Sequence, residues 1–380
     1  MAKAKKASAN PDKGKQLTTA QIISANLEAD KEWHYNDIKE VSYKVPTGSI
    51  NFDFLTDGGL TPGIIRFAGP TETGKTSEAL TIAKNFQDKF KDSLVMFVKC
   101  EGRLDPRLIK RHGINTSNDK WFLYESNIFE VVFKLMAQLI KSSKDKKFLF
   151  IIDSLDGLMT KADAGKTYED AAKIAGAATM ASVFFKQVSL GLRKMGHMAI
   201  FMSQERANNI STTGYTEFKV LKSSGGNAAL HYPDWIFEFL PVRKMDLIWD
   251  GKPGEKGSSI TGSRSRIMIR KSPNERTYEE ISYPIRRRQK TGSSIWAERE
   301  IVELMEAYGI VDRGKSGWFN FPEPVKERAK TLDIDLDVSI QGENRLLLFL
   351  ANKEGEKTFK FLKELTLETM TMILSDDDDD

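Results

Sequence analysis

The segment from Gly69 to Thr76 has the residue types of a loop that holds phosphate. It reads G-P-T-E-T-G-K-T, which fits the pattern G-x-x-x-x-G-K-[ST]. Glycines let the backbone approach phosphate oxygens where a Cβ would block it. Lys75 would place an ammonium near the β and γ phosphates, and Thr76 would offer a hydroxyl to Mg²⁺. A chance match in 380 residues has a probability on the order of a per cent, so the motif predicts nucleotide binding.

The residues around this loop predict the elements that must position it. Residues 64–68 form a short apolar run suited to a buried strand, and apolar side chains recur at helical spacing after the loop. A helix that begins at the loop adds its dipole to anion binding. The predicted nucleotide-binding residues are Gly69, Pro70, Thr71, Glu72, Thr73, Gly74, Lys75, Thr76 and Ser77.

Further apolar runs follow at the spacing of alternating strands and helices. They are residues 94–98, 148–152, 198–202 and 236–240, with a long helical stretch at about 170–195. This alternation predicts an α/β fold with a mostly parallel sheet, whose ligands bind at the carboxyl ends of the strands.

Polar residues follow three of these strands. Asp153 ends one strand and is a candidate to support Mg²⁺, although buried strands often end in aspartate simply because a turn begins. Glu101 is a candidate base for the attacking water. Gln204 carries an amide able to sense a γ-phosphate. We therefore predict catalytic roles for Glu101, Lys75 and Gln204, and metal support by Thr76 and Asp153.

Composition narrows the class of protein. The chain has 40% apolar and 29% charged residues and a formal charge of only +4, so any basic function must be local. Cys100 is the single cysteine, which favours a reducing compartment, and the four histidines have no metal-ligand spacing. The sequence shows no membrane span or signal pattern, so we expect a soluble, intracellular protein without structural zinc.

The termini carry opposite charge. Residues 1–16 hold five lysines and one aspartate, and residues 376–380 are all aspartate. Both segments read as solvated tails, or as a basic arm for nucleic acid and an acidic tail that competes for basic surface. Between them, residues 19–31 predict a helix capped by Thr18 or Thr19, with apolar positions at Ile22, Ile23, Ala25 and Leu27.

Motifs in the order found here resemble the RecA-type DNA recombinases, including their phage-encoded relatives. They are TGS at 47–49, Asp53, GGL at 58–60, GPTETGKT, EGRLDP at 101–106, IIDSLDGL at 151–158, SQER at 203–206 and SGGNAALHY at 224–232. Later segments, 301–321 and 341–365, resemble the small C-terminal domain of the bacterial proteins. The resemblance covers nearly everything after residue 19.

This resemblance implies a RecA-type ATPase core at 46–290 with a mostly parallel sheet. It also implies an N-terminal helix for subunit contact within 1–45 and a small α+β domain at 291–380. The implied activity is an ATP-dependent and Mg²⁺-dependent recombinase that forms a homo-oligomeric filament on single-stranded DNA and exchanges strands with duplex DNA. It implies a cytoplasmic, nucleoid-associated protein, in the host cytoplasm if phage-encoded. Which single-strand-binding or loading proteins cooperate stays open.

The family's two DNA-binding loops would fall at about 156–170 and 205–225. The second is polar and long for a plain connection, which favours function over a mobile surface loop with incidental lysines. Cations would neutralise phosphates and aromatic rings would stack on bases. The predicted DNA-binding residues are Lys161, Lys166, Arg206, Tyr215, Phe218, Lys219, Lys222, Gly225, Gly226 and Asn227.

The resemblance also implies that Asp105 lies near the adenine and that a neighbouring subunit presents Lys271 and Arg276 to the phosphates. The basic run 286–290 beyond them reads as a solvated turn. One departure concerns the residues that would cover the adenine. Arg107 and Leu108 stand where the bacterial proteins commonly place an aromatic residue. Three alternatives remain: a ring helicase on the same core, a mediator that binds ATP and DNA without exchange, and a small-molecule kinase, for which no acceptor site is evident.

Overall fold

The computed structural model describes residues 18–31, 34–36, 39, 41–102, 104–142, 146–166, 176–204, 228–336 and 340–377. The chain divides into two compact units, residues 1–39 and 40–380, which are described separately. None of the described helices combines the length and the apolar content needed to cross a membrane.

The first unit contains the helix α1, Thr19–Ala29. Thr18 caps it, as one of the two predicted cap residues: the Thr18 hydroxyl accepts from the Gln21 backbone N–H at 3.3 Å, and the Gln21 side chain accepts from the Thr18 N–H at 2.9 Å. The helix buries none of its residues within this unit, and Ile22 and Ile23 are 48% and 54% exposed. Its apolar side chains are therefore left uncovered within this unit.

A nine-stranded sheet forms the centre of the second unit, in the order β3-β2-β4-β5-β1-β6-β8-β7, with β9 paired to β8. Six neighbouring strands run parallel to one another: β3, β2, β4, β5, β1 and β6. The strand β8 pairs antiparallel with β6, β7 and β9. The predicted mostly parallel α/β sheet is confirmed. The strands are β1 Gly63–Gly69, β2 Ser93–Lys99, β3 Trp121–Glu125, β4 Lys147–Asp153, β5 Met198–Gln204, β6 Trp235–Phe239, β7 Leu247–Asp250, β8 Ser259–Lys271 and β9 Glu280–Arg286.

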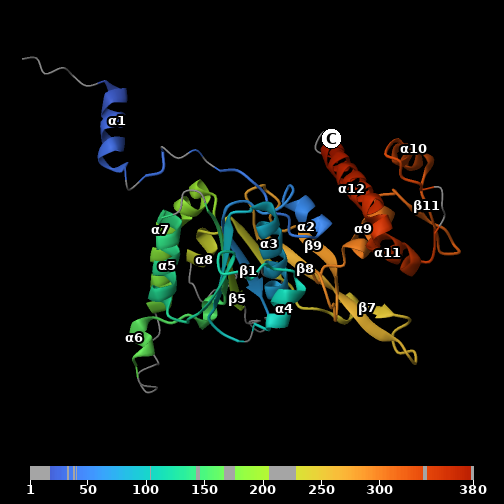
Figure 1. Cartoon of the computed structure of the whole chain (residues 1–380), viewed down its shortest axis with the longest axis horizontal. Coiled ribbons are helices and arrows are strands. Elements are labelled where there is room, and N and C mark those ends of the chain that lie inside the picture. The colour runs from blue at the N-terminus through green and yellow to red at the C-terminus, as the bar shows by residue number, and fades with distance from the viewer. Residues whose placement is uncertain are drawn as a thin grey trace, which may run out of the picture. The chain divides into compact units, whose positions relative to one another are not determined.

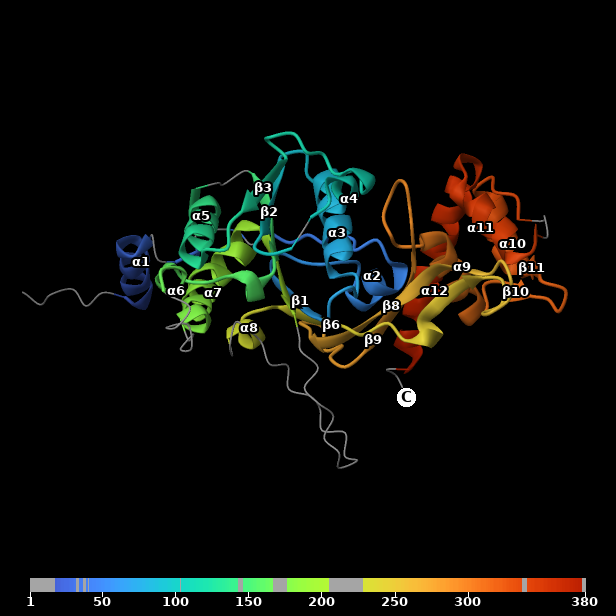
Figure 2. The ribbon, with the colours of Figure 1, turned by 90° about the horizontal axis from the view of Figure 1, so that it is seen from below.

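Helices cover both faces of this sheet. Figures 1 and 2 show α5 and α7 on one side and α3 with α4 on the other. Their bounds are α3 Lys75–Lys89, α4 Pro106–Arg111, α5 Phe129–Ser142 and α7 Gly176–Met195. The predicted helix at 170–195 is thus observed from residue 176, and residues 167–175 lie outside the described part of the chain.

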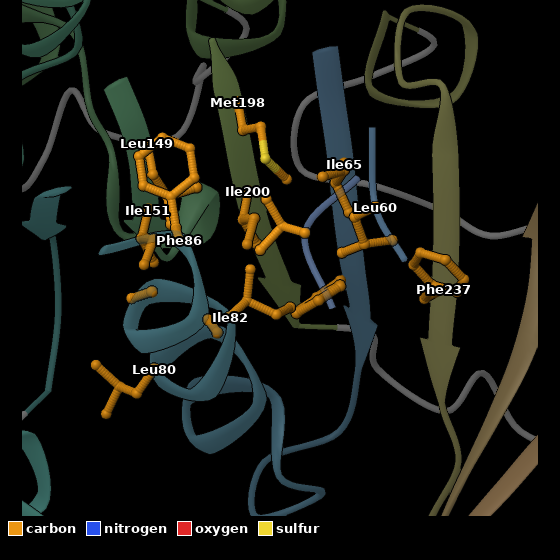
Figure 3. Packing of buried hydrophobic residues seen from close by; sticks show 14 of the residues in the cluster. Leu60, Ile65, Leu80, Ile82, Phe86, Leu149, Ile151, Met198, Ile200 and Phe237 are labelled. Carbon is orange, nitrogen blue, oxygen red and sulfur yellow. The ribbon is translucent and has the colours of Figure 1, made fainter. Parts of the chain in front are cut away.

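Each parallel strand is apolar on both of its faces because both are covered. In β1, Ile65 packs in the core under α3, whereas its neighbour Ile64 packs in the core under α5 and α7. Figure 3 shows Ile82 and Phe86 of α3 lying against this sheet. Burying one such side chain contributes about 1.5–3 kcal/mol, so this packing fixes the helix that begins at the phosphate loop.

A small α+β region follows the sheet and has its own apolar core. It joins the larger core through Glu300, whose Oε1 accepts from the Ser49 hydroxyl at 2.6 Å and from the Asn51 N–H at 2.9 Å. Its elements are α9 Ala297–Ala307, β10 Asp312–Arg313, β11 Trp318–Asn320, α10 Glu323–Thr331, β12 Ile340–Gln341, α11 Glu343–Ala351, η4 Lys353–Gly355 and α12 Glu356–Asp377. Short elements of the larger core are α2 Ile50–Leu55, η2 Leu155–Gly157, α6 Lys161–Ala164, α8 Ala228–His231 and η3 Lys244–Asp246.

Candidate nucleotide-binding site

The phosphate loop connects the end of β1 to the start of α3. Gly69 has φ +138°, and a Cβ there would lie 2.3 Å from the Phe239 carbonyl oxygen, so only glycine fits. Gly74 stands at the N-cap of α3 with φ +100° and offers no side chain to cap the helix. The N–H groups of the first turn of α3 therefore have no side-chain cap, which is the arrangement that favours an anion.

A cavity of about 360 Å³ opens over this loop. Lys75 lies beside it, and its Nζ donates to the carbonyls of Gly69 at 2.8 Å and Pro70 at 2.5 Å. The ammonium is thus held over the loop where phosphate oxygens would arrive. The cavity is lined by Thr71, Glu72, Thr73, Gly74, Lys75, Thr76, Ser77, Asp153, Ser154 and Gln204.

Thr76 and Asp153 place a hydroxyl and a carboxylate side by side next to the phosphate loop. The Thr76 hydroxyl donates to Asp153 Oδ2 at 2.8 Å, so the structure brings the two predicted metal residues together. Burial raises the pKa of the Asp153 carboxyl, while the Thr76 hydrogen bond and the charge of Lys75 oppose that shift. A hydroxyl and a carboxylate beside a phosphate loop fit Mg²⁺, which prefers a few protein oxygens together with phosphate oxygens.

Three strand ends meet beside this pair. Gln204 Nε2 donates to Glu101 Oε1 at 2.8 Å, and the Ser154 hydroxyl donates to the same oxygen. The Gln204 backbone N–H donates to Asp156 Oδ2 at 2.6 Å. The order β2-β4-β5 causes this meeting, because Glu101, Ser154 and Gln204 lie at the ends of neighbouring strands.

Ser154 and Asp156 were not among the residues predicted from the sequence. Ser154 directly follows the predicted Asp153, and Asp156 lies in the same DSLD stretch. A rule that every polar residue just beyond a parallel strand belongs to the site would have found both. They hold Glu101 and Gln204 in place from the end of β4.

Asp105 acts locally as a helix cap. Its carboxylate accepts from the Arg107 N–H at 2.8 Å and pairs with the Arg107 guanidinium at 2.7 Å. These bonds lower the pKa of Asp105. Leu108, one turn into α4, packs against the core under α3. Asp105 does not line the cavity over the phosphate loop.

Lys271 and Arg276 lie away from the cavity of their own chain. Lys271 ends β8 opposite Ile236, near the start of β6, and so lies toward the edge where the parallel strands begin. Its Nζ donates to the His231 carbonyl at 2.6 Å. Arg276 pairs with Glu279 at 3.3 Å, and its guanidinium lies 5.4 Å from the Phe54 ring centroid. Neither residue lines the cavity over the phosphate loop.

The structure describes residues 156–166 of the first expected DNA-binding loop, 156–170. Residues 155–166 contain η2 and the short helix α6. Lys161 and Lys166 are exposed there, and Lys166 pairs with Asp163 at 2.6 Å. The other predicted DNA-binding residues lie outside the described part of the chain: Arg206, Tyr215, Phe218, Lys219, Lys222, Gly225, Gly226 and Asn227.

A second cavity of about 220 Å³ adjoins the phosphate loop at Gly74 and Ser77. Arginines gather on it, three of them from the basic run 286–290, of which Arg287 and Arg288 are exposed. Glu78 reaches the same cavity from α3 and is buried, with no hydrogen-bond partner for its Oε1. The arginines are Arg111, Arg286, Arg287 and Arg288.

Comparison with known proteins agrees with this geometry. The family model described as the RecA N-terminal domain matches residues 32–285. Protein RecA of Cutibacterium acnes is 26% identical over 319 residues, covering 82% of this chain and 84% of that protein. Protein RecA of Gloeobacter violaceus is 27% identical over 278 residues (73% and 69%), and Protein RecA 2 of Myxococcus xanthus is 26% identical over 279 residues (73% and 71%).

The family match spans more than half of the chain and covers every strand of the large sheet except the final residue of β9. It includes the phosphate loop and the strand ends that carry Glu101, Asp153 and Gln204. The chain therefore belongs to the RecA family.

Proposed function

We propose that this protein is an ATP-dependent DNA recombinase that assembles on single-stranded DNA and exchanges homologous strands with a duplex. The observation that carries the proposal is the contact between Gln204 and Glu101 beside the phosphate loop. Gln204 is also the last residue of β5 before the long polar segment 205–227. The side chain of Gln204 thus contacts the candidate base, and its backbone connects directly to the candidate DNA loop.

Each side chain has a step in hydrolysis. Lys75 exchanges its two carbonyl partners for phosphate oxygens, and the first-turn N–H groups of α3 bind the same phosphates. Thr76 and Asp153 would hold Mg²⁺, which neutralises charge on the leaving phosphates. Glu101 accepts a proton from the attacking water.

The resting structure explains why hydrolysis would wait for a signal. Glu101 Oε1 accepts from both Ser154 and Gln204, so two hydrogen bonds hold its carboxylate before nucleotide arrives. When Gln204 turns to a γ-phosphate, one donor leaves Glu101. The same movement displaces the end of β5, from which segment 205–227 departs. ATP and DNA then favour one state, and each tightens binding of the other.

Assembly would complete the site. Lys271 and Arg276 lie outside their own cavity, which supports the role of presenting cations to a neighbouring subunit. The exposed Ile22 and Ile23 of α1 support a contact with a second copy. An apolar groove of about 450 Å³ between α5 and α7 offers such a surface, with Phe133, Val183 and Phe184 in its lining.

ATP turnover with and without single-stranded DNA tests the proposal, with assembly followed by light scattering. DNA should stimulate turnover strongly. Lys75→Ala should be silent, whereas Lys84→Ala on the same helix, whose ammonium pairs with Asp88, should behave as wild type. Glu101→Gln should assemble with ATP but not hydrolyse it, and the exposed Glu125→Gln serves as its control.

The outcomes separate the alternatives. If ATP turnover did not respond to DNA and no large assembly formed, the protein would still be an ATPase, but the proposed recombinase function would be rejected. Unwinding of duplex DNA without strand exchange would favour a ring helicase. DNA binding that is equally tight with ADP and with an ATP analogue would remove the proposed coupling and favour a mediator.

A further inference from the structure

Arg66 is a charged side chain in the middle of the core. It lies in β1, three residues before Gly69, and it is fully buried. Burial of a guanidinium is strongly unfavourable unless hydrogen bonds replace those it made to water. A fully buried arginine must therefore be stabilised by its hydrogen-bond partners, and these partners show which elements it connects.

The guanidinium bridges two elements that are distant in sequence. Nε and one terminal nitrogen donate to the Ser203 hydroxyl at 3.1 and 3.0 Å, and the other terminal nitrogen donates to the Ala229 carbonyl at 3.3 Å. Ser203 is the residue before Gln204, and Ala229 lies in α8. Ser203 and Ala229 are themselves buried, so neither contact is loosened by water.

These two partners flank one stretch of chain. Ser203 directly precedes Gln204, the last residue of β5, and Ala229 is the second residue of α8, which begins at Ala228. Arg66 therefore joins the end of β5 to α8, and it does so from β1, the strand that also carries the phosphate loop. The planar guanidinium donates to the two acceptors from different nitrogens in a fixed fork, whereas an ammonium donates from a single atom with no fixed orientation.

We propose that Arg66 is a positioning residue that couples Gln204 to α8, and through them couples nucleotide state to DNA affinity. This inference rests on the proposed function. A displacement of Gln204 toward the γ-phosphate moves Ser203, and the shared guanidinium passes that displacement to Ala229. Without the bridge, Gln204 still senses the nucleotide, but α8 no longer responds to it.

The test measures the affinity of the full-length protein for single-stranded DNA with ADP and with a non-hydrolysable ATP analogue. The ratio of the two dissociation constants reports coupling. Arg66→Met keeps the length and loses the fork. Ser203→Ala removes one acceptor and keeps the arginine, which preserves a test if Arg66→Met does not fold. Ser203→Thr retains the hydroxyl, and Ser263→Ala is a control at another buried serine of the sheet.

We expect the ratio to fall about tenfold in Arg66→Met and Ser203→Ala, within the range usual for coupled sites. It should stay near the wild-type value in Ser203→Thr and Ser263→Ala. A merely structural role would weaken both affinities alike and leave the ratio unchanged in all four variants, which would overturn the inference alone. A wild-type ratio of one would overturn the proposed function as well.

Discussion

Replacing Glu78 with glutamine is expected to stabilise the protein at neutral and alkaline pH. Glu78 lies in α3, one turn after the phosphate loop, and is only 3% exposed. Its Oε2 accepts from the Tyr283 hydroxyl at 2.8 Å, and its Oε1 has no hydrogen-bond partner among the residues that the structure describes. Burial raises the pKa of Glu78 to about 8, against the opposing bond from Tyr283.

The sign of the effect follows from proton binding. The ordinary pKa is 4.5, so between pH 4.5 and about 8 the folded state keeps a proton that the unfolded state releases. The contribution of Glu78 to stability is complete below pH 4.5 and is lost progressively up to pH 8. At pH 7 the loss amounts to about 3 kcal/mol, at 1.36 kcal/mol for each pH unit above 4.5.

Glutamine keeps the size of the side chain and an acceptor for Tyr283, but it has no proton to lose. The free energy of unfolding of Glu78→Gln should therefore exceed that of the wild type by about 3 kcal/mol at pH 7 and equal it near pH 4.5. Urea unfolding at pH 5, 7 and 8 measures this difference, with the exposed Glu125→Gln as control. A difference that does not change with pH, or a variant that is weaker at pH 8, would refute the reasoning.

Three further outcomes are expected. Because burial raises the pKa of Asp153, Mg²⁺-dependent nucleotide affinity should fall as the pH falls through that pKa, and Asp153→Asn should weaken binding and remove this pH dependence in fluorescence titrations. Asp156→Ala should cut DNA stimulation of ATP turnover several-fold, since the Gln204 N–H loses its acceptor, whereas Asp156→Asn retains an oxygen there and most of the stimulation. Burial raises the pKa of the Cys100 thiol to about 12, so maleimide should label the native protein slowly at pH 7 and rapidly in urea.

The parallel part of the sheet could be predicted because its strands are covered on both faces. Such strands read as continuous apolar runs, and the runs at 148–152 and 198–202 fall inside β4 and β5. The antiparallel strands gave no such signal. In β8 buried residues alternate with partly exposed ones, since one face of an antiparallel strand can meet water, and two of the buried positions are serines, Ser263 and Ser265. The edge strand β3 was not predicted either, although Trp121 to Tyr124 form a short apolar run.

The phosphate loop could be predicted because its chemistry is contiguous in sequence. Eight consecutive residues contain the glycines, the lysine and the hydroxyl that the task requires. Asp153, Glu101 and Gln204 could be proposed because each follows an apolar run. Their mutual contacts could not, because these depend on the strand order β2-β4-β5, which no local pattern encodes.

Arg66 shows the limit of local reasoning most clearly. The run GIIRFAG predicts a buried strand, but arginine is rarely buried, so nothing local to the run indicates that the Arg66 side chain is fully buried. Its partners, Ser203 and Ala229, lie 137 and 163 residues later in the chain. The strand β1 thus carries both the phosphate loop and a buried guanidinium, which hydrogen-bonds to β5 and α8. Nucleotide binding and coupling to DNA would then both depend on β1. A shift of this strand at the phosphate loop would also shift Arg66 and its two hydrogen-bond partners.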